Sequence, residues 1–132
     1  MTQLPVGLGE TSETLFDRVG GKPFFLDLVE QFYALVSKDR ILRPLYPEDL
    51  EPGKGFLAGF LSQYWGGPAD YSAERGHPRL RRRHMAFPIG QTERDSWVNH
   101  MNTALDSMAI SVDDKLAMKK YFNDTASLMM NQ

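Results

Sequence analysis

Large apolar side chains recur at helical spacing shortly after the glycine pair at positions 20 and 21. They fall at i, i+3, i+4, i+7 and i+11, on one face of a helix: Phe25, Leu28, Val29, Phe32 and Val36. Pro23 suits the first turn of such a helix, because its missing N–H needs no partner there. The pattern predicts an amphipathic helix over residues 22–37, with Tyr33 on its core side.

The other stretches before residue 80 differ in how well they fit a helix. Residues 1–11 lack periodicity and are expected to form an irregular leader, after which Ser12 or Thr11 caps a short helix ending near Arg18. The prolines at 44, 47 and 52 predict a turn followed by a loop. A helix is expected over residues 53–65, despite three glycines, and a long loop over residues 68–78.

Two helix-start signals of the form Ser/Thr-x-x-Asp/Glu stand in the last third of the chain, at Thr92 and Ser111. The first helix is expected to bury Trp97, Met101, Leu105 and Met108. The second, over about residues 113–130, is expected to bury Leu116, Tyr121 or Phe122, and Leu128 or Met129. Because no period-two run bounded by hairpin turns is found, the sequence predicts an all-α domain with about five principal helices.

Composition narrows the class of protein. A chain of 132 residues with 42% hydrophobic residues predicts one domain, and the absence of a long apolar stretch predicts a cytoplasmic protein without a membrane span. Zero cysteines exclude disulfides, thiolate metal sites and cysteine nucleophiles. A net charge of -2 argues against general nucleic-acid binding, which needs a broad cationic surface.

One short run departs from this acidic balance, because residues 75–87 hold two histidines and five arginines. His77 precedes a proline, which disfavours helical geometry, and His84 follows seven residues later. In a helix the two would stand about 10 Å apart, too far to share one ion. Glu-x-x-His pairs for a di-iron site are also absent, so a two-histidine metal site is disfavoured.

A haem needs less: one imidazole, a flat apolar slot and cations near its two acid groups. His84 supplies an imidazole, and Arg79, Arg82 or Arg83 supplies the cation. The expected slot residues are Phe56, Leu57, Phe60, Met85, Phe87, Ile89, Trp97 and Met101. The residues alone leave another interpretation open, since a lone histidine is more often a surface or core residue and an arginine run more often a solvated face.

Several motifs are spaced along nearly the whole chain. They are Gly20-Gly21, Phe32-Tyr33, Tyr46-Pro47-Glu48-Asp49, Gln63-Tyr64-Trp65-Gly66-Gly67-Pro68, Tyr71-Ser72, Arg75-Gly76-His77-Pro78, Arg83-His84 and Glu93-Arg94-Asp95-Ser96-Trp97. In this order and spacing they resemble the truncated haemoglobins of group II, over roughly residues 13–130. The resemblance implies a globin domain over residues 12–132, folded as a two-over-two helical sandwich around haem b.

The resemblance also implies residue roles. His84 is the expected proximal iron ligand, and Tyr33, Tyr46 and Trp97 are the expected distal polar groups, with Leu57 beside them. The helix start at residues 51–55 is unusually rich in glycine, so either Gly53 or Lys54 faces the ligand. Neither is a histidine, and the distal hydrogen bonds must therefore come from the two phenols and the indole.

Dioxygen, carbon monoxide and nitric oxide are the expected ligands. Hydrogen bonds to a charged acceptor are worth about 1.5–3 kcal/mol each, so two donors should slow dioxygen release about a hundredfold, too slow for bulk transport. An enzyme is the second hypothesis, a nitric-oxide dioxygenase or peroxidase-like oxidoreductase served by a reductase. A cofactor-free helical interaction module is a weaker third. The expected assembly is a monomer or homodimer.

Overall fold

The computed structural model describes residues 13–132, which form seven α-helices and one 3-10 turn with no strand among them. The expected leader over 1–11 lies outside the described residues, and the predicted cap at Thr11 or Ser12 is wrong, because Thr14 caps the first helix. The helices are α1 (Leu15–Val19), α2 (Lys22–Val36), η1 (Arg43–Leu45), α3 (Glu51–Tyr64), α4 (Asp70–Arg75), α5 (Leu80–His84), α6 (Gln91–Asp106) and α7 (Val112–Met129). The all-α prediction is confirmed.

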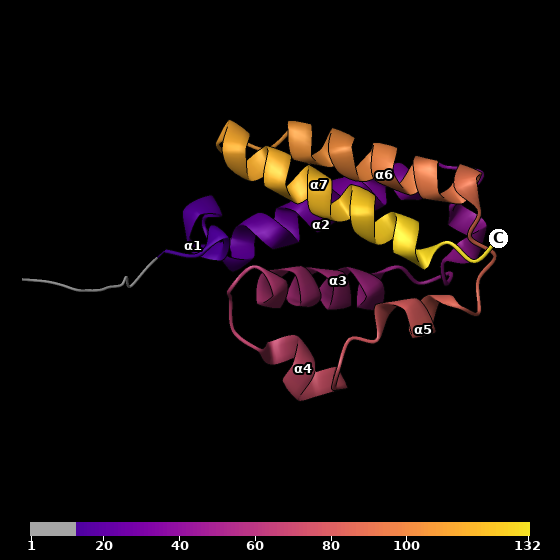
Figure 1. Ribbon diagram of the computed structural model, residues 1–132, viewed down its shortest axis with the longest axis horizontal. Coiled ribbons are helices and arrows are strands. Elements are labelled where there is room, and N and C mark those ends of the chain that lie inside the picture. The colour runs from indigo at the N-terminus through magenta and orange to yellow at the C-terminus, as the bar shows by residue number, and fades with distance from the viewer. Residues whose placement is uncertain (1–12) are drawn as a thin grey trace, which may run out of the picture.

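Four long helices build the molecule in two pairs. Helix α2 packs on α3, α6 packs on α7, and α2 also contacts α6, which joins the pairs (Figure 1). The short helices α4 and α5 lie below α3 in the same view. This arrangement is the expected two-over-two sandwich, and no described helix is long and apolar enough to cross a membrane.

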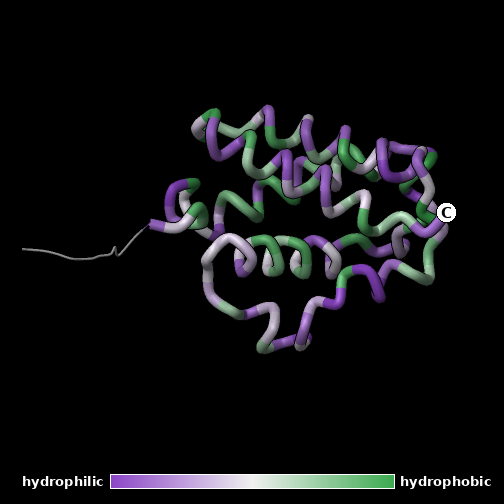
Figure 2. Tube along the Cα trace, in the orientation of Figure 1, coloured by the Kyte–Doolittle hydropathy of each residue, from purple (hydrophilic) through white to green (hydrophobic). Residues whose placement is uncertain are grey.

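The apolar stripe of α2 forms the centre of the core. Phe25, Leu28, Phe32 and Val36 are fully buried, and Val29 almost fully so, as their helical spacing predicted. Met101 and Leu105 of α6 and Met118 and Phe122 of α7 meet this stripe from the other pair. Polar and apolar stretches alternate along the long helices, whereas α5 is largely hydrophilic (Figure 2).

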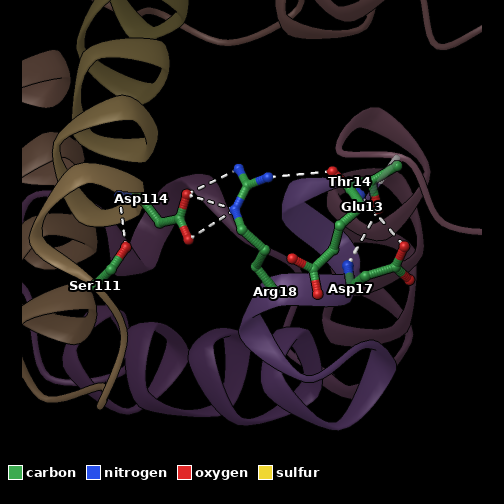
Figure 3. Close-up of polar contacts among 6 residues, drawn as sticks. All are labelled: Glu13, Thr14, Asp17, Arg18, Ser111 and Asp114. Atoms are coloured by element: carbon green, nitrogen blue, oxygen red, sulfur yellow. Dashed lines mark hydrogen bonds and ion pairs between the residues drawn. The ribbon is translucent and has the colours of Figure 1, made fainter. Parts of the chain in front are cut away.

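The end of α1 is tied to the start of α7 by an ion pair. Thr14 caps α1 by accepting a hydrogen bond from the Asp17 amide, one helical turn later. The guanidinium of Arg18 then donates to the Asp114 carboxylate at 2.9 Å (Figure 3). Ser111 accepts from the Asp114 amide at 3.1 Å, which confirms the helix start predicted there.

Other helix starts differ from the sequence prediction. Helix α6 begins at Gln91 after Gly90, whose amide donates to the Glu93 carboxylate at 2.8 Å, so Thr92 is not the cap. Helix α3 begins two residues earlier than predicted, because Pro52 is accommodated in its first turn.

The predicted loop over residues 68–78 is wrong, since it contains α4. The cause is a long-range contact rather than local periodicity. The Gln63 side chain accepts from the Ser72 amide at 2.8 Å and donates to the Ser72 hydroxyl at 2.7 Å. Tyr71 is buried edge-on against Phe60, with ring centroids 5.5 Å apart. These bonds and this buried ring fix one and a half turns that periodicity does not reveal.

The predicted buried face of α7 was partly misplaced. Leu116 is 60% exposed and Leu128 is also exposed, whereas Met118, Phe122 and Ala126 are buried. These three buried residues are spaced four apart, and they lie on a neighbouring face of the helix. Of the two predicted pairs, Phe122 rather than Tyr121 is the buried aromatic residue, and Met129 is half-buried whereas Leu128 is exposed.

Candidate functional site

A cavity of about 550 Å³ opens among the helices, and all of the α-helices except α1 contribute to its lining. This volume is typical of a cofactor or ligand site, for which about 300–1,000 Å³ is usual. The lining is mostly apolar. Its aliphatic and aromatic members include Leu42, Leu45, Leu57, Phe60, Leu61, Leu80, Phe87, Ile89, Phe122, Ala126 and Met129.

His84 is the histidine that lines this cavity. Its Nδ1 lies 2.7 Å from the carbonyl oxygen of Leu80, one helical turn earlier. Because a carbonyl oxygen only accepts, Nδ1 carries the hydrogen, and a neutral ring then keeps its lone pair on Nε2. This is the arrangement that a metal-ligating imidazole requires, with its second nitrogen held by a backbone carbonyl.

The other two histidines have different partners and do not line the cavity. The Nδ1 atom of His77 accepts from the Arg79 amide at 3.2 Å, and its side chain is exposed. The Nε2 atom of His100 lies 2.6 Å from the Asp39 carboxylate. The structure therefore brings a single imidazole to the cavity.

Three polar aromatic side chains line the cavity as well, namely Tyr33, Tyr46 and Trp97. The rings of Tyr33 and Tyr46 meet edge-on with centroids 5.7 Å apart. Trp97 lies next to Tyr46 in the cavity, and its indole N–H lowers the pKa of that phenol, although less than burial raises it. All three side chains thus bring a hydrogen-bond donor to the cavity.

Both phenols stay protonated at neutral pH. Burial raises the pKa of Tyr33 to about 12, against a smaller lowering effect of Lys54. Burial also raises the pKa of Tyr46, and this effect outweighs that of the neighbouring Trp97 indole N–H, which favours the phenolate. Each phenol is consequently a hydrogen-bond donor throughout the physiological range.

The first turn of α3 contributes Gly53 to the cavity lining. Lys54 is not part of that lining, because its ammonium pairs with Glu30 at 3.0 Å and with Glu51 at 2.9 Å. Leu57, one turn after Gly53, also lines the cavity. Of the two alternatives left open by the sequence, the structure places Gly53 and not Lys54 at the site.

The arginines divide into two groups. Arg83 lines the cavity, with its Nε donating to the Pro78 carbonyl at 2.9 Å, while Arg79 and Arg82 lie outside it. Arg75 also lines the cavity, and sequence reasoning did not select it. The residue stands in the Arg-Gly-His-Pro motif, but it fell within the segment expected to be a loop.

Arg75 has an unusual environment. Its guanidinium stacks 3.8 Å from the ring centroid of Phe56, and its Nε is buried without a hydrogen-bond partner among the described residues. An unpaired buried donor on a cation is costly, so the position suits an anionic group of a ligand. The cavity residues therefore fit a flat, apolar, iron-bearing cofactor with acid groups.

The predicted slot is only partly the one observed. Phe60, Phe87 and Ile89 line the cavity, whereas Phe56, Met85 and Met101 do not. Phe56 lies under Arg75, Met85 is 56% exposed, and Met101 is fully buried in the core. Sequence reasoning also missed the contribution of α7 to the site, which consists of Tyr121, Phe122, Thr125, Ala126 and Met129.

Comparison with known proteins agrees with this architecture. A family model described as bacterial-like globin matches residues 14–131. The group 2 truncated hemoglobin YjbI of Bacillus subtilis is 33% identical over 125 residues, covering 95% of this chain and 94% of the relative.

Solved structures give the same result. The hemoglobin of Chloroflexus aurantiacus superposes with a TM-score of 0.90 at 47% identity, covering 92% of this chain and 100% of that one. The group II truncated hemoglobin of Bacillus anthracis superposes with a TM-score of 0.88 at 35% identity, covering 92% and 93%.

Proposed function

Because the chain belongs to the bacterial-like globin family, as a truncated haemoglobin of group II, we propose that it holds haem b through His84 and takes up small diatomic ligands. Ferrous haem b supplies an iron that binds dioxygen, carbon monoxide and nitric oxide reversibly. The observation that carries the proposal is one cavity lined both by an imidazole with a free Nε2 and by three hydrogen-bond donors.

The residues around the cavity divide the work. His84 Nε2 would hold the iron, and the Leu80 carbonyl keeps the ring in the tautomer that ligation needs. Arg75 and Arg83 would neutralise the acid groups of the cofactor, and Phe60 and other apolar side chains would exclude water from it. Each of these side chains lines the cavity, which supports the role proposed for it.

Tyr33, Tyr46 and Trp97 give the site its preference among ligands. In this proposal the O–H groups of the two phenols and the indole N–H of Trp97 donate to a ligand with negative charge on its outer atom. Each such bond is worth about 1.5–3 kcal/mol, so two donors slow the release of dioxygen roughly a hundredfold or more. Carbon monoxide carries little charge and gains less from these donors.

The absorption spectrum of the purified protein tests this proposal. We expect a strong Soret band, a shift of that band when carbon monoxide is added to the reduced protein, and slow dioxygen release in stopped flow. A colourless protein that takes up no haem in reconstitution would contradict the proposal. If dioxygen were released as fast as expected for a cavity without hydrogen-bond donors, haem binding would still stand, but the proposal of slow release would be wrong.

A second candidate function is a haem oxidoreductase of the nitric-oxide dioxygenase or peroxidase type, supplied with electrons by a reductase. The observation that favours it is that both distal phenols remain protonated, because protonated donors polarise a bound peroxide or retain dioxygen for reaction with nitric oxide. Consumption of nitric oxide over many turnovers, with a reductant present, would support this function. Reaction limited to one equivalent would favour reversible binding.

A further inference from the structure

Helix α5, which carries His84, is too short to hold its own position. It has five residues, none of them buried, and it begins after Arg79, whose backbone is in the left-handed conformation with φ 48°. Isolated helices shorter than about 12–15 residues are marginal in water. The orientation of the His84 ring toward the cavity must therefore be fixed by contacts from elsewhere in the chain.

Those contacts come from the residues that follow α7. Asn131 Nδ2 donates to the Phe87 carbonyl at 2.7 Å and to the His84 carbonyl at 3.4 Å. Asn131 Oδ1 accepts from the Ile89 amide at 3.0 Å. The Asn131 amide also donates to the Ile89 carbonyl at 2.9 Å. The Asn131 side chain thus both donates hydrogen bonds to and accepts one from residues 84–89.

No other part of the chain between residues 13 and 132 makes a long-range hydrogen bond to residues 84–89. The remaining contact, from the Gln132 amide to the Ile89 carbonyl at 3.3 Å, comes from the neighbouring residue. Phe87 and Ile89 both line the cavity, so the same amide also positions two side chains of the apolar slot.

We propose that Asn131 is a positioning residue for the axial histidine: its side-chain amide clamps residues 84–89 and thereby sets the orientation of the His84 ring toward the bound cofactor. Leu80 fixes the ring from within the helix, and Asn131 fixes the backbone just beyond it. The inference rests on the proposed function, because it assigns His84 as the ligand. It adds that the ligand's geometry is set by a residue 47 positions away.

The test compares two amide-to-leucine substitutions on the full chain loaded with haem. Asn131→Leu removes all three side-chain hydrogen bonds at similar size, whereas Gln132→Leu is the matched control, since the Gln132 side chain forms no hydrogen bond within the described residues. The measurements are the iron–histidine stretching band of the reduced protein in resonance Raman and the rate of haem loss to an apo-globin acceptor. Amide exchange of Ile89 in the haem-loaded protein gives a third readout.

We expect Asn131→Leu to broaden or shift the iron–histidine band, to speed haem loss about tenfold and to accelerate exchange of the Ile89 amide. Gln132→Leu should match the wild type in all three. Asn131→Asp keeps an acceptor for Ile89 but loses both donations, so Ile89 should stay protected while the band still changes. This variant also serves if Asn131→Leu does not fold.

Two results would overturn the inference. If both Asn131 variants kept the wild-type band and haem-loss rate and only lowered the melting temperature, Asn131 would be structural and not a positioning residue. If the wild type itself gave no iron–histidine band, the proposed function would be wrong and the clamp would fail with it. The two failures are distinguished by the wild-type spectrum.

Discussion

The hydroxyl oxygen of Tyr33 lies 2.8 Å from the point where a Cβ atom on Gly53 would stand. Real side chains essentially never make so close a contact, so Gly53 leaves the space that this hydroxyl occupies. Tyr33 belongs to α2 and Gly53 to the first turn of α3. A glycine that weakens a helix start is therefore a requirement for placing one of the polar groups of the cavity.

Gly53→Ala should displace the Tyr33 hydroxyl and alter the rate of dioxygen release by several-fold. Overpacking of this kind costs about 1–3 kcal/mol, which outweighs the roughly 0.5–1 kcal/mol that alanine gains over glycine within a helix. Urea unfolding and stopped-flow release measure the two effects. Gly55→Ala is the control, because nothing lies within 4 Å of a Cβ built there, and it should stabilise the protein. Equal stabilisation by both substitutions would contradict the proposed clash.

Trp97→Phe and Tyr46→Phe should each accelerate dioxygen dissociation by roughly ten- to a hundredfold, since each removes a hydrogen bond worth about 1.5–3 kcal/mol and keeps most of the ring. Carbon monoxide dissociation should change much less. The ratio of the two rate changes then isolates the electrostatic contribution of the donors to dioxygen retention. A non-additive double variant would indicate that the two donors act through each other, as the effect of the Trp97 indole on the pKa of Tyr46 implies. Identical release from wild type and both variants would remove these residues from the ligand site.

Periodicity predicts the long helices of the fold better than the short ones. The stripe of α2 is a strong helical signal because its five apolar residues repeat over about three turns, and all of them are buried. Helix α4 carries no such signal, since its position depends on Gln63 bonding to Ser72 across nine residues. Contacts of this kind depend on where other elements lie, which a local pattern does not encode.

The limit of local patterns also explains which site residues were predicted correctly and which were not. Each of His84, Tyr33, Tyr46 and Trp97 lies in a motif matched to the family, and the structure places all four at the cavity. The cations and part of the slot were chosen by nearness in sequence to the histidine, which selected Met85 and omitted Arg75. Successive residues of a helix point in different directions, so neighbours of a ligand along the chain need not face the same cavity.

His84→Ala should abolish stable haem retention, because it removes the imidazole that lines the cavity. His77→Ala and His100→Ala are controls, since these rings bond to Arg79 and Asp39 instead. The absorption spectrum of each reduced variant is the measurement. A normal five-coordinate ferrous spectrum in the His84 variant would disprove the axial assignment.

Arg75→Gln and Arg83→Gln should speed haem loss several-fold, because these two arginines reach the cavity. An exposed ion pair is worth about 0–1 kcal/mol, and the partly buried setting of Arg75 should place its effect at the upper end. Arg79→Gln and Arg82→Gln serve as charge-matched controls, as both lie outside the cavity lining. Haem loss that depended only on the number of arginines removed would favour a general charge effect over specific pairing.

Asp114→Asn should lower the melting temperature at neutral pH by removing the carboxylate that pairs with Arg18 at 2.9 Å. The hydrogen bond from Arg18 holds the pKa of Asp114 below the ordinary 3.8 despite partial burial. Between the folded and the unfolded pKa of Asp114, the unfolded chain therefore binds more protons than the folded one. The stability that the ion pair contributes is complete above about pH 3.8 and is lost as the pH falls through the lower folded pKa. The difference in melting temperature between wild type and variant should stay constant from pH 7 to 5 and shrink below 3.8.

Asp113→Asn removes a carboxylate from the same helical turn, so comparing the two variants cancels the helix-dipole effect. A gap between them that is unchanged at acid pH would show that the Arg18 pair does not stabilise the fold.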